Sequence, residues 1–406
     1  MKSNDSTTDD QGWKHLLWLA AYKPYEGLAR LGLYFLRWLP ESWRPKTRFL
    51  RSASERIGHL AIEPDLFLKE LQLGMRPPGK YILVTRPGKV CNPCMLDYWK
   101  PLLRIYDHGL MRFLLLPVSR QRSLGIELNE PIIADQKTAG TMKVQAAWGN
   151  RPPLLTMRED HRRRGEAVMA KLGLPPGAWW VCVHVREPGY LPAHKYAEDY
   201  RNTDINALIP AMDEIVRRGG WCVRMGHPSG KPLAPRKGVI DYAHTPERSD
   251  WMDVYLGAGC RFFLGCTSGI AFVASVFGKP VVQANAAPFS TILWYGPQDL
   301  GLAKLYVESA SGRVLNFAEV FSTKVGNFRR PEDFTEAGLQ LRDNTPEEIK
   351  DAATDMFEQL EGKTRTAEDL ALERKFLTLM KPGHYSYGSP ARVAPSFLRR
   401  YRDLLA

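Results

Sequence analysis

The sequence predicts an α/β protein whose main sheet is parallel and covered by helices on both faces. Between residues 178 and 290, short apolar runs alternate with helical stretches, which is the pattern of strand–helix–strand units. The runs are apolar almost throughout, as expected for strands buried on both faces. Right-handed crossovers then give a doubly wound sheet. The expected strands are Trp179–Val185, Trp221–Met225, Val239–Tyr242, Cys260–Gly265 and Pro280–Ala284.

Helices are expected between these strands and after them. Those between strands are Ile205–Val216, Trp251–Gly257 and Ser268–Phe277. Farther along, Thr345 stands before Pro346 and three residues before Glu348, which is the signature of a capping box at a helix start. A further helix is expected over residues 366–380, and a basic helical tail ends the chain.

Length and composition fit two or three folded domains. The chain has 406 residues, of which 44% are hydrophobic and 25% charged, close to the averages for globular proteins. No uncharged apolar run approaches the roughly 20 residues that a membrane-spanning helix needs. These features exclude a collagen, a wholly disordered chain and a polytopic membrane protein.

The chain divides into five expected segments. They are a disordered stretch (1–12), an amphipathic helical segment (13–49), a first α/β domain (50–160), a second α/β domain with the main sheet (161–335) and C-terminal helices (336–406). In the first domain, Lys80–Thr85 and Phe113–Val118 are expected to be strands. The helix expected at His161–Gly177 links the two domains.

Residues 13–40 show helical periodicity with an apolar side rich in Trp, Tyr and Leu. Two interpretations stay open: the helix packs on the first domain, or it lies in the interface of an anionic membrane. Cations interrupt the apolar stretch, so the segment would lie on a bilayer and not cross it. These cations are Lys14, Lys23, Arg30 and Arg37; the C-terminal tail would add Arg399, Arg400 and Arg402.

The cysteines and the N-terminus favour a reducing cytoplasm. Four of the six cysteines lie in or at the ends of strand-like runs and are expected to be small buried hydrophobes. Cys91 and Cys94 form a lone CxxC, which disfavours both a zinc site and a redox pair. The first residues lack the pattern of a secretory signal. The expected location is cytoplasmic, with peripheral attachment to the inner face of the plasma membrane as an extension.

The positive net charge of the chain favours an anionic binding partner. The formal net charge is +12, which suits nucleic acid, an anionic membrane or phosphorylated small molecules. Nucleic acid is disfavoured, because the basic residues are dispersed and no zinc-finger or RNA-binding motif is present. Phosphorylated small molecules and a membrane surface remain.

Polar residues follow every strand of the main sheet, at the edge where open α/β sheets bind ligands. Thr267-Ser268-Gly269 stands between a buried strand and an expected helix start, a geometry suited to a diphosphate. The alternative for Ser268 is an ordinary helix N-cap. Arg186 would be a second cation at this edge; its alternative is a surface ion pair with Glu187 or Asp199.

The sequence disfavours several common cofactors. No strand is followed by GxGxxG, and GxxxxGK[ST] is absent, which argues against nicotinamide cofactors and P-loop hydrolysis. No two aspartates are spaced as DxD. We therefore expect no cofactor and no metal ion.

These motifs, in this order, resemble a family of bacterial glycosyltransferases associated with surface-polysaccharide and glycan loci. More distantly, the first strand end and the strand–Ser–helix step are similar to those of nucleotide-sugar fucosyltransferases. The motifs that carry the resemblance are HVR (184–186), YRN (200–202), DI (204–205), VRMG (223–226), DYA (241–243), RSDWMDVYL (248–256), FFLGCTSG (262–269), FGKPVVQAN (277–285), RIGHLAIEPDLF (56–67) and CNPCMLDYW (91–99). The resemblance implies a GT-B architecture, in which two Rossmann-like domains face each other.

The resemblance also implies residue roles. The second domain would bind a UDP- or GDP-linked sugar, and the first a glycan, lipid-linked or protein acceptor, in surface glycan biosynthesis. Arg186 would hold the β-phosphate, while Asp241–His244 would lie near the base or ribose. The implied donor-binding residues are His184, Arg186, Arg201, Asn202, Arg224, Gly226, Asp241, Tyr242, His244, Thr267, Ser268, Gly269 and Asn285.

A catalytic base is expected from the first domain. His59 and Glu63 stand four residues apart, on one face if the segment is helical. An imidazole or carboxylate on the acceptor side can take the hydroxyl proton during direct displacement. We expect His59 to be that base; its alternative is a structural histidine, and a retaining enzyme would need no such base.

Two other functions remain as alternatives. One is a different group transferase, such as a pyruvyl transferase, on a similar two-domain frame. The other is a protein that binds a nucleotide or carbohydrate without catalysis. Binding of nucleoside diphosphates, followed by a turnover assay, separates the three.

Overall fold

The structure is a computed structural model, and it describes most of the chain. The described residues are 20–29, 31–32, 34–35, 47–120, 124–128, 139–188, 198–382 and 384–405. The expected disordered stretch (1–12) lies outside them, as does much of the segment 13–49.

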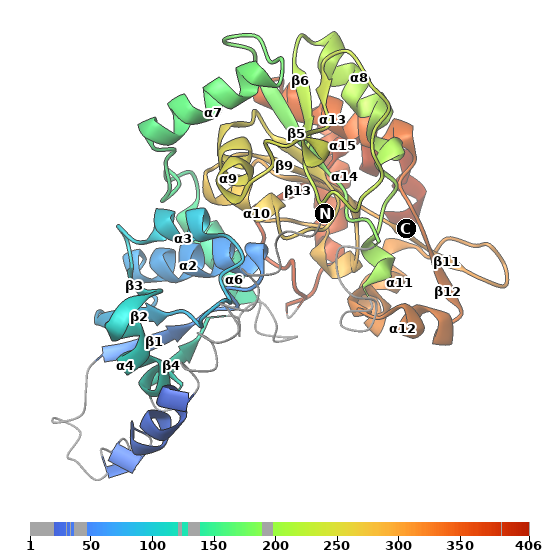
Figure 1. The fold of residues 1–406 in the computed structure, drawn as a ribbon. Helices are drawn as coiled ribbons and strands as arrows, with labels where there is room; N and C mark the ends of the chain where they lie inside the picture. The colour runs from blue at the N-terminus through green and yellow to red at the C-terminus, as the bar shows by residue number, and fades with distance from the viewer. Residues whose placement is uncertain are drawn as a thin grey trace, which may run out of the picture.

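The first sheet has four parallel strands in the order β3-β2-β1-β4. Helices α2 and α3 cover the face turned toward the rest of the molecule, and α4 covers the other (Figure 1). The elements of this part are β1 (Thr47–Arg51), α2 (Ile57–Gln72), β2 (Lys80–Val84), α3 (Pro93–Trp99), β3 (Arg104–Tyr106), α4 (Gly109–Ser119), β4 (Gly125–Glu127) and α6 (Ala139–Trp148). Helix α7 (Glu159–Lys171) follows and lies against α9 (Asp250–Gly259) of the second part.

The second sheet has seven parallel strands in the order β13-β10-β9-β8-β5-β6-β7. Helices α8 and α13 pack on one face, while α9 and α10 pack on the other (Figure 1). Its elements up to β10 are β5 (Trp180–His184), α8 (Ile209–Arg217), β6 (Trp221–Arg224), β7 (Val239–Ile240), α9 (Asp250–Gly259), β8 (Phe263–Gly265), α10 (Ala271–Val276), β9 (Val281–Ala286) and β10 (Leu300–Ala303).

The C-terminal part completes this second sheet. Its elements are β11 (Leu305–Glu308), α11 (Phe317–Ser322), α12 (Pro331–Glu336), β12 (Leu339–Arg342), α13 (Pro346–Leu360), α14 (Ala367–Leu379), β13 (Arg392–Val393) and α15 (Pro395–Arg400). Strand β13 pairs with β10 at the sheet edge, whereas β11 and β12 form a separate antiparallel pair. The capping box is confirmed: the Thr345 hydroxyl accepts from the Glu348 amide, and the Glu348 carboxylate accepts from the Thr345 amide.

Single-turn 3₁₀ helices punctuate the connections. They are η2 (Asp199–Arg201), η3 (Ile205–Leu208), η4 (Tyr242–His244), η5 (Phe289–Thr291), η6 (Lys324–Asn327) and η7 (Arg402–Leu405). Two of them, η2 and η4, follow strands of the second sheet and carry residues expected at the site.

The two sheets are joined through packed helices. Helix α2 lies against α10, and α3 lies against α9. The side chains between them form one hydrophobic cluster, which includes Leu60 and Phe67 of α2 with Val254 of α9 and Val273 of α10. Burial of such side chains is worth about 1.5–3 kcal/mol each. This cluster fixes the first turn of α2 against the second sheet.

The prediction of an α/β fold with a parallel main sheet is confirmed, and all five strands expected between residues 178 and 290 are present. Two elements were predicted wrongly. The expected strand Phe113–Val118 is part of helix α4. The helix expected from Ser268 begins only at Ala271.

Candidate functional site

Helix α2 begins against the turn that follows β8. A Cβ added to Gly58 would lie 2.8 Å from the Gly269 Cα, so only glycines allow the two backbones to meet this closely. The same turn contacts the end of β5, since the Arg186 amide donates to the Cys266 thiol at 3.0 Å. The turn 266–269 therefore joins the start of α2 to the carboxyl edge of the second sheet.

His59 and Glu63 form a hydrogen-bonded pair on α2. The distance from His59 Nδ1 to Glu63 Oε1 is 2.7 Å, and the Glu63 side chain is buried. The other oxygen, Oε2, accepts from the Ala53 amide at 3.1 Å. With Nδ1 donating to the carboxylate, Nε2 keeps its lone pair and can accept a proton. The expected one-face placement is confirmed.

The turn after β8 differs from the expected anion site. The Thr267 hydroxyl is buried and accepts from Gln283 Nε2 at 3.1 Å and from the Ala287 amide at 3.2 Å. Ser268 does not cap α10, because Ile270 occupies the cap position and makes no side-chain cap bond. Helix α10 has six residues, so its dipole contributes little. Thr267 is a structural residue here.

Arg186 and Arg201 converge on one carboxylate. Arg186 Nη1 lies 3.0 Å from Glu198 Oε2, and Arg201 Nη2 contacts the same oxygen. About a fifth of each arginine side chain is exposed, 20% and 19%. The structure thus brings together two of the expected cations, and the partner of Arg186 is Glu198 instead of Glu187 or Asp199.

His184 ends β5 behind these arginines. Burial, with the nearby cations Arg224 and Arg186, lowers the pKa of His184 to about 3. The imidazole is therefore neutral at physiological pH. Its buried Nδ1 has no hydrogen-bond partner, so His184 can offer a hydrogen bond but no charge to a ligand.

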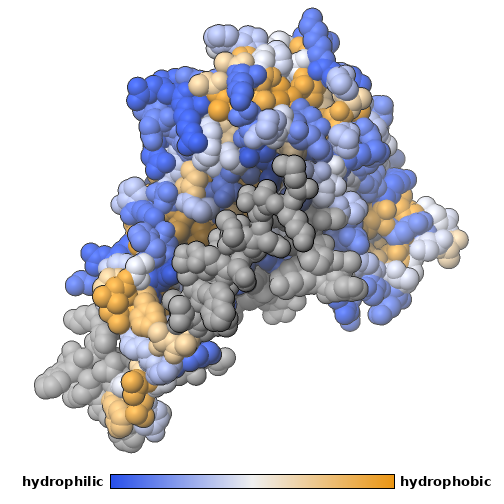
Figure 2. All heavy atoms as spheres, viewed as in Figure 1, coloured by the Kyte–Doolittle hydropathy of each residue, from blue (hydrophilic) through white to orange (hydrophobic). Residues whose placement is uncertain are grey.

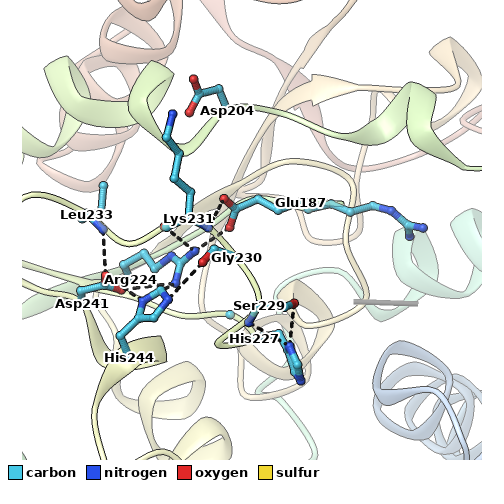
Figure 3. A network of polar contacts seen from close by, with 12 residues as sticks. Glu187, Asp204, Arg224, His227, Ser229, Gly230, Lys231, Leu233, Asp241 and His244 are labelled. Atoms are coloured by element: carbon cyan, nitrogen blue, oxygen red, sulfur yellow. Dashed lines mark hydrogen bonds and ion pairs between the residues drawn. The ribbon is translucent and has the colours of Figure 1, made fainter. Parts of the chain in front are cut away.

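Arg224 is enclosed in a network of its own (Figure 3). Its side chain is fully buried. The guanidinium contacts Glu187 Oε2 at 2.5 Å, Asp241 Oδ1 at 3.3 Å and the Lys231 carbonyl at 3.2 Å. A buried charge needs such partners to offset its desolvation. Through these contacts Arg224 holds the loop 226–233 against the sheet. Its guanidinium is therefore not available to the donor, contrary to expectation.

The other residues expected near a base or ribose serve the same network. His244 Nδ1 lies 2.9 Å from Asp241 Oδ2, and its Nε2 lies 3.1 Å from the Gly230 carbonyl. Asp241 also accepts from the Leu233 amide at 2.9 Å. Tyr242 is buried, and its hydroxyl accepts from the Ser249 amide at 2.9 Å. These groups are occupied in fixing loops.

Gly226 and Asn285, two residues expected to bind the donor, have backbone conformations with positive φ. Gly226 has φ of +152°, a conformation that glycine adopts without strain. Asn285 has φ of +51° and is fully buried. Its side chain and backbone exchange hydrogen bonds with Asn344, both at 2.6 Å. Asn285 therefore ties β9 to the residue before the N-cap of α13.

A cavity of about 520 Å³ is lined by residues that directly follow Arg186 and Arg201 in the chain, although neither arginine lines it. Its walls come from the segments that follow β5 and β6 of the second sheet and from those that follow η2 and β12. The lining residues are Glu187, Pro188, Asn202, Thr203, Asp204, Ser229, Gly230, Lys231 and Asp343. Buried Asn202 Oδ1 and Thr203 Oγ1 have no hydrogen-bond partner, which leaves them available to a polar ligand.

Sequence reasoning missed several residues of this region. Lys304 is buried and donates to the Asn202 carbonyl and to Asp343 Oδ1, both at 2.8 Å. Together with Glu198 it shapes the segment that carries Arg201. The only signal was a lysine at the end of an apolar run, which is too common to single out.

The CxxC cysteines carry no sign of a reactive or metal-binding site. Burial raises the pKa of the Cys94 thiol to about 11, which keeps it protonated. Cys94 Sγ lies 3.6 Å from His161 Nε2. Within the described ranges, no group of three or more His, Cys, Asp or Glu residues is placed to hold a metal ion.

No family profile and no curated protein matches the sequence. Some solved structures are weakly similar. A family 9 glycosyl transferase from Veillonella parvula is 12% identical over 58% of this chain and 79% of its own, with a TM-score of 0.37. The iron-containing dodecameric glycosyltransferase TibC from enterotoxigenic E. coli is 12% identical over 63% of this chain and 62% of its own, with a TM-score of 0.37. The TibC complex with ADP-D-beta-D-heptose is 13% identical over 63% of this chain and 62% of its own, with a TM-score of 0.35. Likenesses this weak assign neither a fold family nor an activity.

Proposed function

We propose that this protein is a glycosyltransferase of the GT-B type that moves a sugar from a nucleoside diphosphate to a hydroxyl acceptor. The observation that carries the proposal is the turn 266–269, which joins two kinds of group. On one side it contacts the start of α2, which bears the His59–Glu63 pair. On the other it holds Arg186 at the edge of the second sheet. A base and a phosphate-binding cation thus flank one junction, as sugar transfer requires.

The donor would bind at the carboxyl edge of the second sheet. Arg186 and Arg201 would supply the charge for the diphosphate. The 520 Å³ cavity, which is lined by their sequence neighbours Glu187 and Asn202, has the volume for a nucleoside. Asn202 Oδ1 and Thr203 Oγ1, both buried and unpartnered, would contact its hydroxyl or base groups. We propose UDP or GDP as the nucleotide, and no metal ion, because the arginines offset the diphosphate charge.

The acceptor would bind on the α2 side. His59 Nε2 would take the proton of the attacking hydroxyl while Glu63 stabilises the imidazolium. The proton moves to His59, the acceptor oxygen bonds to the anomeric carbon, and the nucleoside diphosphate leaves with the bonding electrons. A glycan, a lipid-linked saccharide or a protein would supply the hydroxyl, as in bacterial surface glycan biosynthesis.

Nucleotide binding and metal removal test this function together. We expect UDP or GDP to raise the melting temperature, and donor hydrolysis to continue at the same rate in EDTA. Thermal shift and a nucleotide-release assay measure the two. Stabilisation by neither nucleotide would count against the proposal, while binding without turnover would favour a silent binding protein. A rate lost in EDTA and restored by Mg²⁺ or Mn²⁺ would overturn the metal-free mechanism.

We further propose that the protein works in the cytoplasm, at the inner face of the plasma membrane. The helical residues 20–29 dock on α4 through Tyr22 and Tyr25, whose rings lie 5.9 and 5.3 Å from that of Phe113. Beyond this contact, Leu28, Leu31 and Phe35 are exposed; they are spaced to share one helical face.

Apolar residues also gather at this end of the molecule in Figure 2. Both sequence interpretations of the segment thus have support, since one part packs and another is exposed. The tail contributes less than expected, because its arginines are paired. Arg399 contacts Asp369, Arg400 lies 2.9 Å from Asp351, and Arg402 lies 3.2 Å from Glu368. No helix within the described ranges has the length and apolar character to cross a bilayer.

Replacing Leu28 and Leu31 with glutamate should reduce membrane binding. We expect the unaltered protein to float with vesicles of phosphatidylglycerol and phosphatidylcholine at low salt, because exposed apolar groups and nearby cations act together. The double variant should remain largely at the bottom of the gradient. Leu377→Glu, on the exposed side of α14, is the matched control and should float. Equal flotation of all three proteins would remove this helix from membrane binding.

A further inference from the structure

Glu198 sits where an anionic ligand of the two arginines would sit. Arg186 and Arg201 both contact its Oε2. The carboxylate is only partly buried, with 28% of its side chain exposed, so solvent reaches this ion pair. Glu198 precedes η2 directly, and the Arg201 amide donates to the Glu198 carbonyl at 3.1 Å. The carboxylate and one of its arginines thus belong to the same turn.

One carboxylate leaves this pair of arginines under-satisfied. Two guanidinium groups and one carboxylate carry a net charge of +1. Arg201 Nε is buried and has no hydrogen-bond partner. Burial and the neighbouring Arg201 lower the pKa of Arg186, which shows that the charge of Glu198 does not offset both effects. A ligand with more negative charge and more acceptor oxygens would satisfy these donors better.

We propose that Glu198 is an internal anion that holds Arg186 and Arg201 in place and is displaced by the diphosphate of the donor. This inference rests on the proposed function for the identity of the ligand, although the chemistry recognised is that of any diphosphate. The carboxylate keeps the two cations together when no ligand is bound. It also competes with the ligand, so it sets the affinity of the site.

Competition between the Glu198 carboxylate and a diphosphate for the two arginines should weaken diphosphate binding. If the arginines are paired with Glu198 in most molecules, the apparent dissociation constant of a diphosphate is raised by the reciprocal of the open fraction. The Glu198 side chain is partly exposed, so its ion pairs with the two arginines are modest in strength and a more highly charged anion can displace it. Removing the carboxylate charge should therefore strengthen diphosphate binding, whereas a purely structural ion pair would leave binding unchanged or weaken it.

Glu198→Gln tests the proposal with inorganic pyrophosphate as the probe. We expect the dissociation constant measured by calorimetry to fall by about 10-fold, the factor that corresponds to about 1.4 kcal/mol. The matched control is Glu373→Gln. Glu373 is also shared by two arginines, with Arg365 at 2.8 Å and Arg392 at 3.9 Å, but lies on α14 far along the chain. The Glu373→Gln protein should bind pyrophosphate with the same dissociation constant as the unaltered protein.

The outcomes separate the two proposals. Tighter binding by Glu198→Gln alone supports displacement, and Glu198→Ala should repeat it if the amide variant folds poorly. Equal or weaker binding by both Glu198 variants, with unaltered melting temperatures, overturns the role of Glu198 while leaving the anion site. If no protein binds pyrophosphate, the diphosphate site itself fails, and the proposed function fails with it. Tighter binding without any sugar transfer would keep the displacement and reject only the reaction.

Discussion

Replacing His59 with alanine is expected to lower kcat for sugar transfer by about 10³-fold, within the range of a general base. The variant loses the group that would take the acceptor proton, and a factor of this size corresponds to about 4 kcal/mol in the barrier. Nucleoside diphosphate affinity should stay unchanged, because His59 lies on α2 and the arginines lie beyond the turn 266–269. Steady-state transfer kinetics and calorimetry measure the two quantities.

Two further variants show whether the loss belongs to this imidazole. Glu63→Gln should lower kcat by about 10²-fold, because an amide neither stabilises the imidazolium nor accepts both hydrogen bonds that Glu63 accepts. His108→Ala is the matched control, since His108 also pairs with a carboxylate, Asp107, at 2.8 Å, but is exposed. A fully active His59→Ala would exclude His59 as the base and favour a retaining mechanism.

The five strands expected between residues 178 and 290 were predictable because strands buried on both faces are apolar almost throughout. Strands β5, β6 and β8 lie within the apolar runs from which they were expected. Strand β13 has two residues, Arg392 and Val393, and exists because the chain returns to the free edge of β10. Nothing local marks such a strand, since its partner lies far away in the sequence.

The segment Phe113–Val118 shows why an apolar run alone is ambiguous. One side of α4 packs on β1 and β2, while Phe113 on another side meets the rings of Tyr22 and Tyr25. A helix contacted on two sides needs apolar residues around much of its circumference, so its 3.6-residue period is hidden. Pro117 in its last turn adds a second false signal for an extended segment.

In the candidate site, contacts between residues close in sequence could be predicted, whereas contacts between residues far apart in sequence could not. The His59–Glu63 pair follows from helical spacing alone, and the structure confirms it. Arg224 was expected on the donor because the family resemblance implied it, yet its partners Glu187 and Asp241 lie 37 and 17 residues away. Its burial could not be read from spacing. Three-dimensional pairing decides which cations remain available to a ligand.

Replacing Arg186 with alanine is expected to lower kcat/KM for the donor by about 10²-fold and to weaken nucleoside diphosphate binding. The loss of one charge-stabilising donor at a departing diphosphate costs roughly 3 kcal/mol in the transition state. Arg186 is a better residue to test than Arg224, because the Arg224 guanidinium is already paired with the carboxylates of Glu187 and Asp241. Transfer kinetics and calorimetry with UDP or GDP measure both effects.

The fold should survive this substitution, since Arg186 Nη1 contacts only Glu198 among the ion pairs of the described chain, and the backbone bond to Cys266 is retained. Arg236→Ala is the matched control, because Arg236 forms a surface ion pair with Asp213 at 2.8 Å; its kinetics should be unchanged. Unaltered kinetics in Arg186→Ala would take this residue out of the site. A loss shared equally by Arg201→Ala would instead indicate that both guanidinium groups contact the same diphosphate, since they now contact the same carboxylate oxygen.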